Sequence, residues 1–597
     1  MTSPIEDYAL IGDCQTAALV SREGSIDWLC LPRFDSAACF AALLGTPDHG
    51  RWSIAPASPI RSVVRSYRGA SLVLETVFTT DEGEVALIDC MPPRGEIADL
   101  VRIVECRRGQ VPMRLEFAVR FDYGSFVPWV ERCEAGITAI AGPDTLRLRS
   151  RVPLHGEQFK TLANFVVGAG DRLPFDLTWG PSHRPLPAPI DPEWSLRDTE
   201  HWWRDWACAC TYRGPWRDDV VRSLVTLKGL TFAPTGGIVA APTTSLPAQF
   251  GGVRNWDYRY CWLRDATFTL YALLGGGFLE EARAWRAWLL RAVAGKPSQL
   301  QIVYGIAGER RLPEMELPWL PGYGGAAPVR IGNSAAQQFQ HDVVGEVMDT
   351  MHQCWRAGIV GSRDGWRLER ALINHLEATW EKPDKGIWEV RGPDQHFTHS
   401  KVMAWVGVDR AIKAVEQFGF DGPVDRWRRL RAEIHEQVCR RAYDSDLGAF
   451  VQFYGSKRLD ASLLVMPLVG FLPASDPRVR GTVAAIERHL TREGCFVYRY
   501  VTDRDVEGLP TGEAAFLLCS FWLVDNLVLM GRHDEAERIF ERLLSVRNDV
   551  GLLSEGYDVD GRRLAGNYPQ AFSHVGLVNS AVNLAPGRGP AEERPSR

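Results

Sequence analysis

The sequence lacks the features of several large protein classes. Its formal net charge is only −6 over 597 residues, whereas proteins that bind a phosphate backbone usually carry an excess of lysine and arginine. Its longest apolar run, AAFLLCSFWLV, ends at Asp525 and is too short to cross a bilayer. These absences argue against nucleic acid and against the membrane as partners.

Signals for secretion and for metal binding are also missing. The first ten residues, MTSPIEDYAL, carry acids where a secretory signal carries lysines. The 13 cysteines include no Cys-x-x-Cys pair, which disfavours a zinc ribbon or a thioredoxin-like site. There is no His-Glu-x-x-His motif and no complete EF-hand loop. We therefore expect a cytoplasmic protein with reduced, buried thiols, without a metal and without a cofactor.

The N-terminal part of the chain has the pattern of a β-sandwich. Short runs rich in Val, Ile, Leu and Phe are separated by Gly, Pro, Asp and Arg, which is typical of many short strands. They include ALVSREGSIDWLCL, SLVLETVFTT, EVALIDCMPP, LVRIVECRRG, MRLEFAVRFDY and ANFVVGAGDRL. A proline-rich break follows at residues 180–192. We assign residues 1–190 to an antiparallel β-sandwich and residues 191–215 to a linker helix.

The rest of the chain predicts helices. Three stretches, which begin at Arg264, Ser400 and Glu513, join a nearly apolar helix to an amphipathic one through a glycine turn. Repeated pairs of a buried helix and a covering helix are typical of a closed α/α toroid or a solenoid. Roughly a dozen candidate helices between residues 216 and 585 suit six pairs closed into a barrel. We expect residues 586–597 to form a disordered tail.

Two glutamates occur in long loops of this helical part. Glu389 lies in GIWEVRG, between Trp388 and Val390, and an apolar surround raises the pKa of a carboxyl group, which suits a general acid. Glu555 lies in LLSEGYD, a more polar setting in which an ionised carboxylate suits a general base. Two such carboxylates are the minimum apparatus for cleaving a glycosidic bond. The alternative is that both are ordinary loop glutamates.

The stretch NWDYRYCWLRDATFTLYAL places a charged pair among aromatic residues. Arg264 and Asp265 are adjacent at a predicted helix start and project about 100° apart, so both can serve one ligand. A guanidinium donor and a carboxylate acceptor together suit vicinal hydroxyls. The predicted pocket walls are Trp256, Tyr258, Tyr260 and Trp262. The alternative is a buried ion pair at the helix start. Glu513, at the head of another apolar helix, either points into the pocket or favours the helix dipole.

Four motifs together resemble glycoside hydrolase family 15, the glucoamylase and trehalase family. They are YRYCWLRDATFTLYAL, KGIWEVRG, CFVYRYVTDRD and LLSEGYD…YPQAFSHVGLVNS. Two further segments, IEDYALIGDCQTAALVSREGSIDWLCLPRFDS and PVRIGNSAAQQFQHDVVGEVMD, resemble its bacterial trehalase-like branch with the N-terminal domain of that branch. The resemblance covers about residues 5–583. It implies an N-terminal β-sandwich followed by an (α/α)6 barrel, with the site at one end of the barrel.

The resemblance also implies residue roles. Glu389 matches the general acid and Glu555 the general base. Arg264 and Asp265 match the pair that holds the terminal glucose, and Arg499 matches an arginine near the second sugar. The full substrate-binding set that we predict is Arg264, Asp265, Trp262, Trp388, Arg499, Tyr258 and Glu513. Fungal glucoamylases have a second acid directly after the catalytic acid, where this chain has Val390, and this departure disfavours long starch-like substrates.

The implied activity is that of an inverting, exo-acting α-glucoside hydrolase that releases β-glucose, with α,α-trehalose as the expected substrate. The expected partner is therefore a small carbohydrate, and the sequence leaves the oligomeric state open. Three alternatives remain at this point. One is hydrolysis of malto- or isomalto-oligosaccharides, the second is a glycoside phosphorylase, which needs no catalytic base, and the third is a non-catalytic sugar-binding protein.

Overall fold

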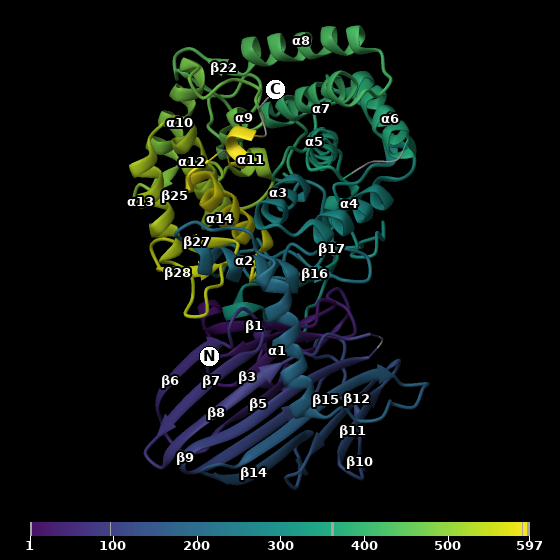
Figure 1. Ribbon diagram of the computed structural model, residues 1–597, viewed down its shortest axis with the longest axis vertical. Coiled ribbons are helices and arrows are strands. Elements are labelled where there is room, and N and C mark those ends of the chain that lie inside the picture. Colours follow the sequence, from purple (N-terminus) through teal and green to yellow (C-terminus); the bar gives the residue numbers. More distant parts are fainter. Residues whose placement is uncertain (1–2, 96, 360–362, 588, 594–597) are drawn as a thin grey trace.

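The computed structural model describes residues 3–95, 97–359, 363–587 and 589–593. It has an antiparallel sheet domain formed by the N-terminal part of the chain and a helical domain formed by the rest (Figure 1). Helix α1 (Pro192–Cys208) connects them. Its start is fixed by the Asp191 carboxylate, which accepts hydrogen bonds from two backbone N–H groups of the first turn, and by a proline at the first helical position. No helix in the described ranges is long and apolar enough to cross a membrane.

One long strand organises the sheet domain. The N-terminal half of β9 (Ala98–Ala118) pairs with β8 (Gly83–Cys90) and β15 (Arg172–Pro181), and its C-terminal half pairs with β5 (Arg51–Pro56) and β14 (Lys160–Gly168). The sequence predicts two strands here, LVRIVECRRG and MRLEFAVRFDY, because the polar residues between them interrupt the apolar pattern. The backbone nevertheless stays extended, because β8 and β14 pair with this exposed segment.

The other strands extend this sheet on both sides of β9. The principal path runs β1-β2-β3-β5-β9-β15-β12-β11-β10, and all pairs are antiparallel. The remaining strands of the sheet are β1 (Tyr8–Gly12), β2 (Ala17–Ser21), β3 (Ser25–Cys30), β4 (Ala38–Phe40), β6 (Ile60–Tyr67), β7 (Leu74–Thr80), β10 (Trp129–Cys133), β11 (Gly136–Ala141), β12 (Asp144–Ser150) and β13 (His155–Glu157).

The helical domain contains an inner ring of helices. Each contacts the next in a closed order, in which the last contacts the first. The ring consists of α3 (Ala266–Gly276), α5 (Asp342–Arg356), α7 (Thr398–Phe418), the short pair η7–α9 (Ala461–Leu464 and Val465–Leu468), α12 (Leu517–Leu529) and α14 (Ala571–Leu584). Against the ring pack α2 (Arg217–Gly229), α4 (Leu279–Val293), α6 (Arg363–Thr379), α8 (Val424–Arg441), α10 (Pro477–His489) and α13 (His533–Leu544).

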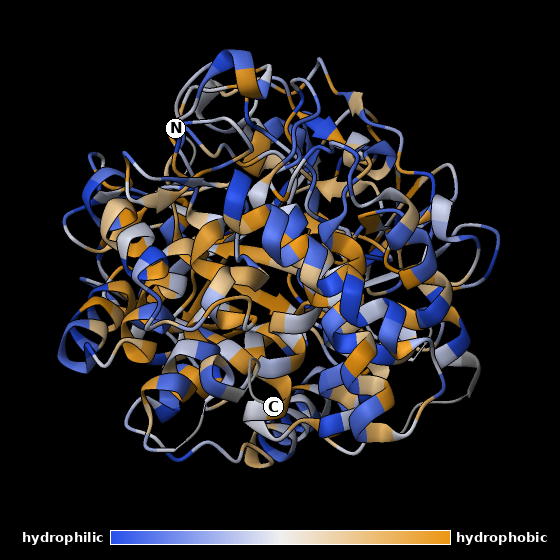
Figure 2. Cartoon of the chain, turned by 90° about the horizontal axis from the view of Figure 1, so that it is seen from above, coloured by the Kyte–Doolittle hydropathy of each residue, from blue (hydrophilic) through white to orange (hydrophobic). Residues whose placement is uncertain are grey.

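Burial follows the predicted division between inner and outer helices. Residues 517–528 of α12 are all buried, whereas α13 buries Ala536, Phe540 and Leu543 and exposes its charged face. Figure 2 shows apolar segments gathered towards the middle of the molecule and polar ones around its rim. The three predicted helix pairs are confirmed as α3–α4, α7–α8 and α12–α13. They pair because a helix that is apolar all round has to be covered by an amphipathic neighbour.

Short elements join these helices. Two-stranded sheets are β16–β17 (Thr231–Phe232, Gly237–Ile238), β18–β19 (Cys261–Trp262, Val303–Tyr304), β20–β21 (Met315–Glu316, Arg330–Ile331), β22–β23 (Tyr443–Asp444, Ala449–Phe450) and β24–β25 (Thr491–Arg492, Phe496–Val497). A three-stranded sheet is formed by β26 (Ala515–Phe516), β27 (Gly556–Asp558) and β28 (Arg563–Ala565), and α11 (Arg504–Glu507) is a single turn.

The sheet domain supports loops of the helical domain. The indole N–H of Trp28 donates to the carbonyl oxygen of Pro242 at 2.8 Å. Arg259, buried and paired with Asp257, donates to the carbonyl oxygen of Ser36 at 2.8 Å. The segment between residues 242 and 262, which carries most of the aromatic residues of the predicted site, is therefore anchored on the sheet domain.

The C-terminal tail differs from the prediction of disorder for residues 586–597. Residues Pro590–Glu593 form the short helix α15, and Ala591 is buried. Its backbone N–H donates to the side-chain oxygen of Asn583, near the end of α14, at 2.9 Å. One apolar residue in a polar segment is enough to dock it here, whereas residues 588 and 594–597 lie outside the described residues.

Candidate active site

A pocket with about 580 Å³ of empty space opens among the loops of the helical domain. Its walls come from segments 254–262, 333–338, 388–391 and 499–509. These segments directly precede the inner helices α3, α5, α7 and α12. The pocket therefore lies at the N-terminal ends of the inner helices, where long loops on a rigid scaffold commonly carry function.

Five of the predicted site residues line this pocket: Tyr258, Trp262, Trp388, Glu389 and Arg499. The other four lie behind them. Three of these, Arg264, Glu555 and Glu513, hydrogen bond to a lining residue, and Asp265 pairs with Arg264. The fold thus brings together residues from five separate parts of the sequence.

Glu389 stands in a tight turn with its carboxylate facing cationic and polar groups. Its φ angle is +51°, in the left-handed region that residues other than glycine rarely adopt, and such backbone strain is concentrated at functional sites. Trp262 Nε1 and Arg264 Nη1 donate to Glu389 Oε1 at 3.1 and 2.9 Å. The side chain is 22 % exposed. The apolar surround predicted from Trp388 and Val390 is therefore wrong for the carboxylate, which is partly exposed and accepts hydrogen bonds from Trp262 and Arg264.

Arg264 holds three groups at once. Besides Glu389, its guanidinium donates to the carbonyl oxygen of Ile387 at 2.8 Å and to Asp265 Oδ1 at 3.1 Å. Burial alone lowers the pKa of Arg264, but the charges of Glu389 and Asp265 raise it above its usual value. Burial raises the pKa of Asp265 to about 6, although the charge of Arg264 acts in the opposite direction. The predicted pair is thus present, and its guanidinium bridges to the candidate acid.

Glu555 is buried directly before β27. It is only 5 % exposed, so its polar surroundings are groups of the protein and not solvent. Tyr258 OH donates to its Oε1 at 2.6 Å, and the backbone N–H of Asn567 donates to its Oε2 at 3.3 Å. Burial raises the pKa of Glu555, while the hydrogen bond from Tyr258 and the charge of Arg499 lower it. Both oxygens accept hydrogen bonds, an arrangement that favours the carboxylate form.

Tyr258 connects the two glutamates electrostatically. It lines the pocket together with Glu389 and meets Trp262 edge-on, with ring centroids 5.4 Å apart. Burial raises the pKa of Tyr258 well above its usual value, and the charges of Glu555 and, to a smaller extent, Glu389 act in the same direction. Both carboxylates therefore lie within electrostatic range of one hydroxyl group.

Arg499 and Glu513 form a buried ion pair at the pocket. Arg499 Nε donates to Glu513 Oε2 at 3.1 Å, and its guanidinium lies over the ring of Trp388, 5.2 Å from the centroid. Helix α12 begins only at Leu517, so the predicted position of Glu513 at the head of the helix is wrong. Glu513 is the counter-ion of Arg499. The indole N–H of Trp388 donates to Asp460 Oδ1 at 3.0 Å.

Sequence reasoning missed several residues at this site. Asn567 ties its loops together: its side chain accepts from Thr243 Oγ1 at 2.9 Å and donates to the carbonyl oxygen of Trp256 at 2.9 Å. Asp342, at the start of α5, is fully buried. Further missed lining residues are Arg254, Ser334, Gln338, Arg391 and Glu507. The polar segment GNSAAQQFQHD before an apolar helix was the one available signal.

The polar groups that line the pocket are carboxylates, guanidinium groups, amides and hydroxyls. Within the described part of the chain, no group of three or more histidine, cysteine, aspartate and glutamate side chains is arranged to hold a metal ion.

The chain matches known proteins over nearly its full length. The family model "Glycosyl hydrolases family 15" matches residues 214–582, and the model "Trehalase-like, N-terminal" matches residues 1–163. The trehalase of Mycobacterium tuberculosis is 38% identical over 97% of this chain and 89% of its own length. The trehalase of Thermoplasma volcanium is 33% identical over 97% of this chain and 93% of its own length.

A solved structure shows the same fold. The crystal structure of a bacterial glucoamylase complexed with acarbose superposes with a TM-score of 0.72 at 12% identity, covering 98% of this chain and 94% of that chain. The sheet domain and the helical domain match the fold of that structure, and the family model and the relatives define the chain as a glycoside hydrolase. Within that class, the chain belongs to glycosyl hydrolase family 15.

Proposed function

We propose that this protein is an α,α-trehalase that hydrolyses trehalose to two glucose molecules with inversion at the cleaved carbon. One observation carries the mechanism: Tyr258 lines the same pocket as Glu389 and donates to Glu555 at 2.6 Å. This supports two carboxylates acting at one bond, as inverting hydrolysis requires. The choice of trehalose is supported by full-length relatives that carry this name at 33% and 38% identity.

We assign the catalytic roles as follows. Glu389 donates a proton to the glycosidic oxygen, and Glu555 removes a proton from the water that attacks the opposite face of the sugar. Arg264 and Asp265 bind the hydroxyls of the glucose whose anomeric carbon is attacked by water. The ring of Trp262 borders this glucose. Arg499, held by Glu513, lies over Trp388 and reaches towards the second glucose.

The finer fold is proposed on similar grounds. The closed order of inner helices α3, α5, α7, η7–α9, α12 and α14, each covered by an outer helix, supports an (α/α)6 barrel over residues 216–585. The two halves of β9, each paired with a different set of strands, support a β-sandwich over residues 1–190, with residues 191–215 as the linker.

We also propose that the protein works in the cytoplasm on a small carbohydrate. All 13 cysteines are free thiols, and ten of them are buried. Unpaired, buried thiols fit a reducing compartment. The pocket is lined by aromatic and hydrogen-bonding side chains, among them Tyr258, Trp262 and Arg499, which suit a small sugar.

Proton NMR of the nascent products tests the proposal. Trehalose, maltose, isomaltose and maltotriose are supplied in parallel, and the anomeric signals are followed before mutarotation. Inverting hydrolysis of trehalose releases α-glucose and β-glucose in equal initial amounts, whereas retention releases α-glucose alone. Faster hydrolysis of another sugar would keep the mechanism and change the substrate. Initial α-glucose alone from trehalose would exclude the roles assigned to Glu389 and Glu555.

A further inference from the structure

The outer wall of the pocket is built around Trp256. The guanidinium of Arg391 lies over the Trp256 ring, 4.1 Å from its centroid, and that of Arg330 lies 4.5 Å from it. The backbone carbonyl of Trp256 accepts hydrogen bonds from Ser245 and from the side chain of Asn567, both at 2.9 Å. Two cations on one half-buried indole fix the ring, because each is attracted to the aromatic face.

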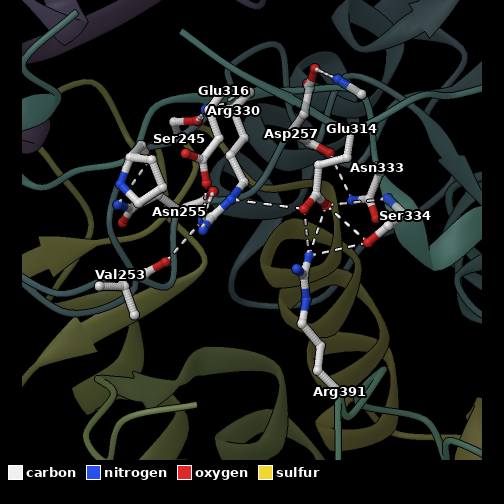
Figure 3. A network of polar contacts seen from close by, with 12 residues as sticks. Ser245, Val253, Asn255, Asp257, Glu314, Glu316, Arg330, Asn333, Ser334 and Arg391 are labelled. Carbon is white, nitrogen blue, oxygen red and sulfur yellow. Dashed lines mark hydrogen bonds and ion pairs between the residues drawn. The ribbon is translucent and has the colours of Figure 1, made fainter. Parts of the chain in front are cut away.

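Both cations are themselves held by other groups (Figure 3). Arg391 Nη2 donates to Glu314 Oε2 at 2.7 Å, and Ser334 Oγ donates to the same oxygen at 3.0 Å. Arg330 donates to the carbonyl oxygens of Val253 and Asn255 at 3.0 and 3.2 Å. Glu314 directly precedes β20 and does not line the pocket. The segment before β20 therefore holds Arg391 from outside the pocket.

Arg254 and Glu507 form a further part of the pocket wall. Arg254 forms a buried ion pair with Glu507 of α11. The backbone N–H of Arg391 donates to the carbonyl oxygen of Glu507 at 3.0 Å. Arg391 is therefore held at its backbone by α11 and at its side chain by Glu314, and it stands only two residues after Glu389.

The outer wall lies next to Glu389, where the second sugar of the substrate binds. Val390, between Glu389 and Arg391, is buried, and its side chain has no carboxylate. Trp256, Ser334 and Arg391 line the pocket together with Glu389. The leaving glucose, which receives the proton of Glu389, therefore contacts these residues. The part of the Trp256 indole that the two guanidinium groups leave exposed to the pocket provides apolar contact for a sugar ring, and a guanidinium donates to hydroxyls.

We infer that Trp256, clamped by Arg391 and Glu314, is the specificity-determining surface for the second glucose. The inference rests on the proposed function. In α,α-trehalose both anomeric carbons take part in the linkage, so the second ring offers only its face and its hydroxyls. A surface fixed before binding recognises such a ring without the entropy cost of ordering a loose side chain.

Substitution of Trp256 tests the inference with two substrates. Trehalose occupies both halves of the pocket, whereas α-glucosyl fluoride has one sugar ring and occupies the inner half alone. In Trp256→Ala we expect kcat/KM for trehalose to fall about 10-fold or more, mainly because KM rises. A loss of this size corresponds to one lost ring contact. The value for α-glucosyl fluoride changes less than about twofold. Trp256→Phe keeps an aromatic face and restores part of the loss.

A second variant separates the clamp from the ring. Glu314→Gln leaves Trp256 in place and removes the charge that holds Arg391, so we expect the same selective loss for trehalose, in a smaller amount. Trp129→Ala, which removes an exposed tryptophan of β10 in the sheet domain, is the matched control and changes neither substrate. Circular dichroism and the thermal midpoint confirm that each variant is folded.

Two results would overturn the inference. Equal loss of both activities in folded Trp256→Ala would mean that the ring supports the whole site, and unchanged trehalose kinetics would mean that it contacts no second sugar. Failure of the proposed function is distinct, because it shows in the wild-type protein as hydrolysis of a different disaccharide. The same comparison is then made between that disaccharide and α-glucosyl fluoride.

Discussion

Nη1 of Arg264 donates a hydrogen bond to Oε1 of Glu389 at 2.9 Å. The residue expected to bind sugar hydroxyls is thus already bound to the proposed general acid. The same guanidinium donates to Asp265 Oδ1 at 3.1 Å. One side chain therefore connects the proposed general acid to the carboxylate that is assigned to the hydroxyls of the terminal glucose.

The two glutamates are predicted to differ in their dependence on the leaving group. Glu389→Gln removes the proton donor, so kcat for trehalose falls about 10²- to 10⁴-fold. Hydrolysis of α-glucosyl fluoride is largely kept, because fluoride departs without a general acid. Glu555→Gln removes the base and abolishes both activities. Steady-state kinetics with the two substrates check this, and loss of both activities in Glu389→Gln would contradict its role as the acid.

Arg264→Lys is predicted to be a severe change although it keeps the charge. The guanidinium donates to Ile387, Asp265 and Glu389 in fixed directions, and an ammonium group cannot reproduce this planar geometry. We expect kcat/KM to fall about 100-fold for trehalose and for α-glucosyl fluoride alike, a loss of the size seen when a positioning contact is misplaced. Arg428→Lys on the exposed face of α8 is the control. A loss confined to trehalose would place Arg264 at the second sugar instead.

Tyr258→Phe is predicted to move the acidic limb of the pH profile of kcat/KM towards higher pH. Glu555 must be ionised to act as a base, so activity is lost as the pH falls through its pKa. The hydrogen bond from Tyr258 lowers that pKa against the effect of burial, and its removal lets the pKa rise. Profiles of kcat/KM, which report on the free enzyme, check the direction. An unmoved limb would mean that Glu555 does not control it.

Asp342→Asn is predicted to flatten the pH dependence of stability. Burial, and then the charge of Asp384, raises the pKa of Asp342 to about 8, whereas an unfolded aspartate titrates near about 3.9. Between these values the folded state holds the extra proton, so this group lowers the free energy of unfolding as the pH rises. The variant should therefore lose less stability than the wild type between about pH 5 and pH 8.

Urea unfolding of both proteins at the two pH values measures this difference. Asp446→Asn, which alters an aspartate with an exposed side chain, is the control and should follow the wild type. An identical pH dependence in Asp342→Asn and the wild type would show that Asp342 titrates normally in the folded protein.

Local features of this chain were predictable from the sequence. The pairs α3–α4, α7–α8 and α12–α13 follow from helical periodicity and glycine turns, which act between residues a few positions apart. The short motifs around Glu389 and Glu555 identified the family, because each is contiguous in sequence. Trp262, Trp388 and Arg499 were found at the pocket for the same reason.

The environments of those residues were not predictable in the same way. Glu555 receives its hydrogen bond from Tyr258, a residue 297 positions earlier in the chain. Glu513 pairs with Arg499 because the chain turns back before α12 begins. The continuity of β9 likewise depends on β8 and β14, which pair with its polar middle.

The sequence by itself determined the chemistry that is available, namely two glutamates, a guanidinium–carboxylate pair and a set of indole rings on a scaffold of helix pairs. The tertiary structure alone decided which carboxylate is buried, which one faces Arg264, and that Trp256 is held by Arg391. Burial and hydrogen-bond partners set these properties, and both arise from contacts between segments that are distant in the sequence. Local pattern carries no information about such contacts.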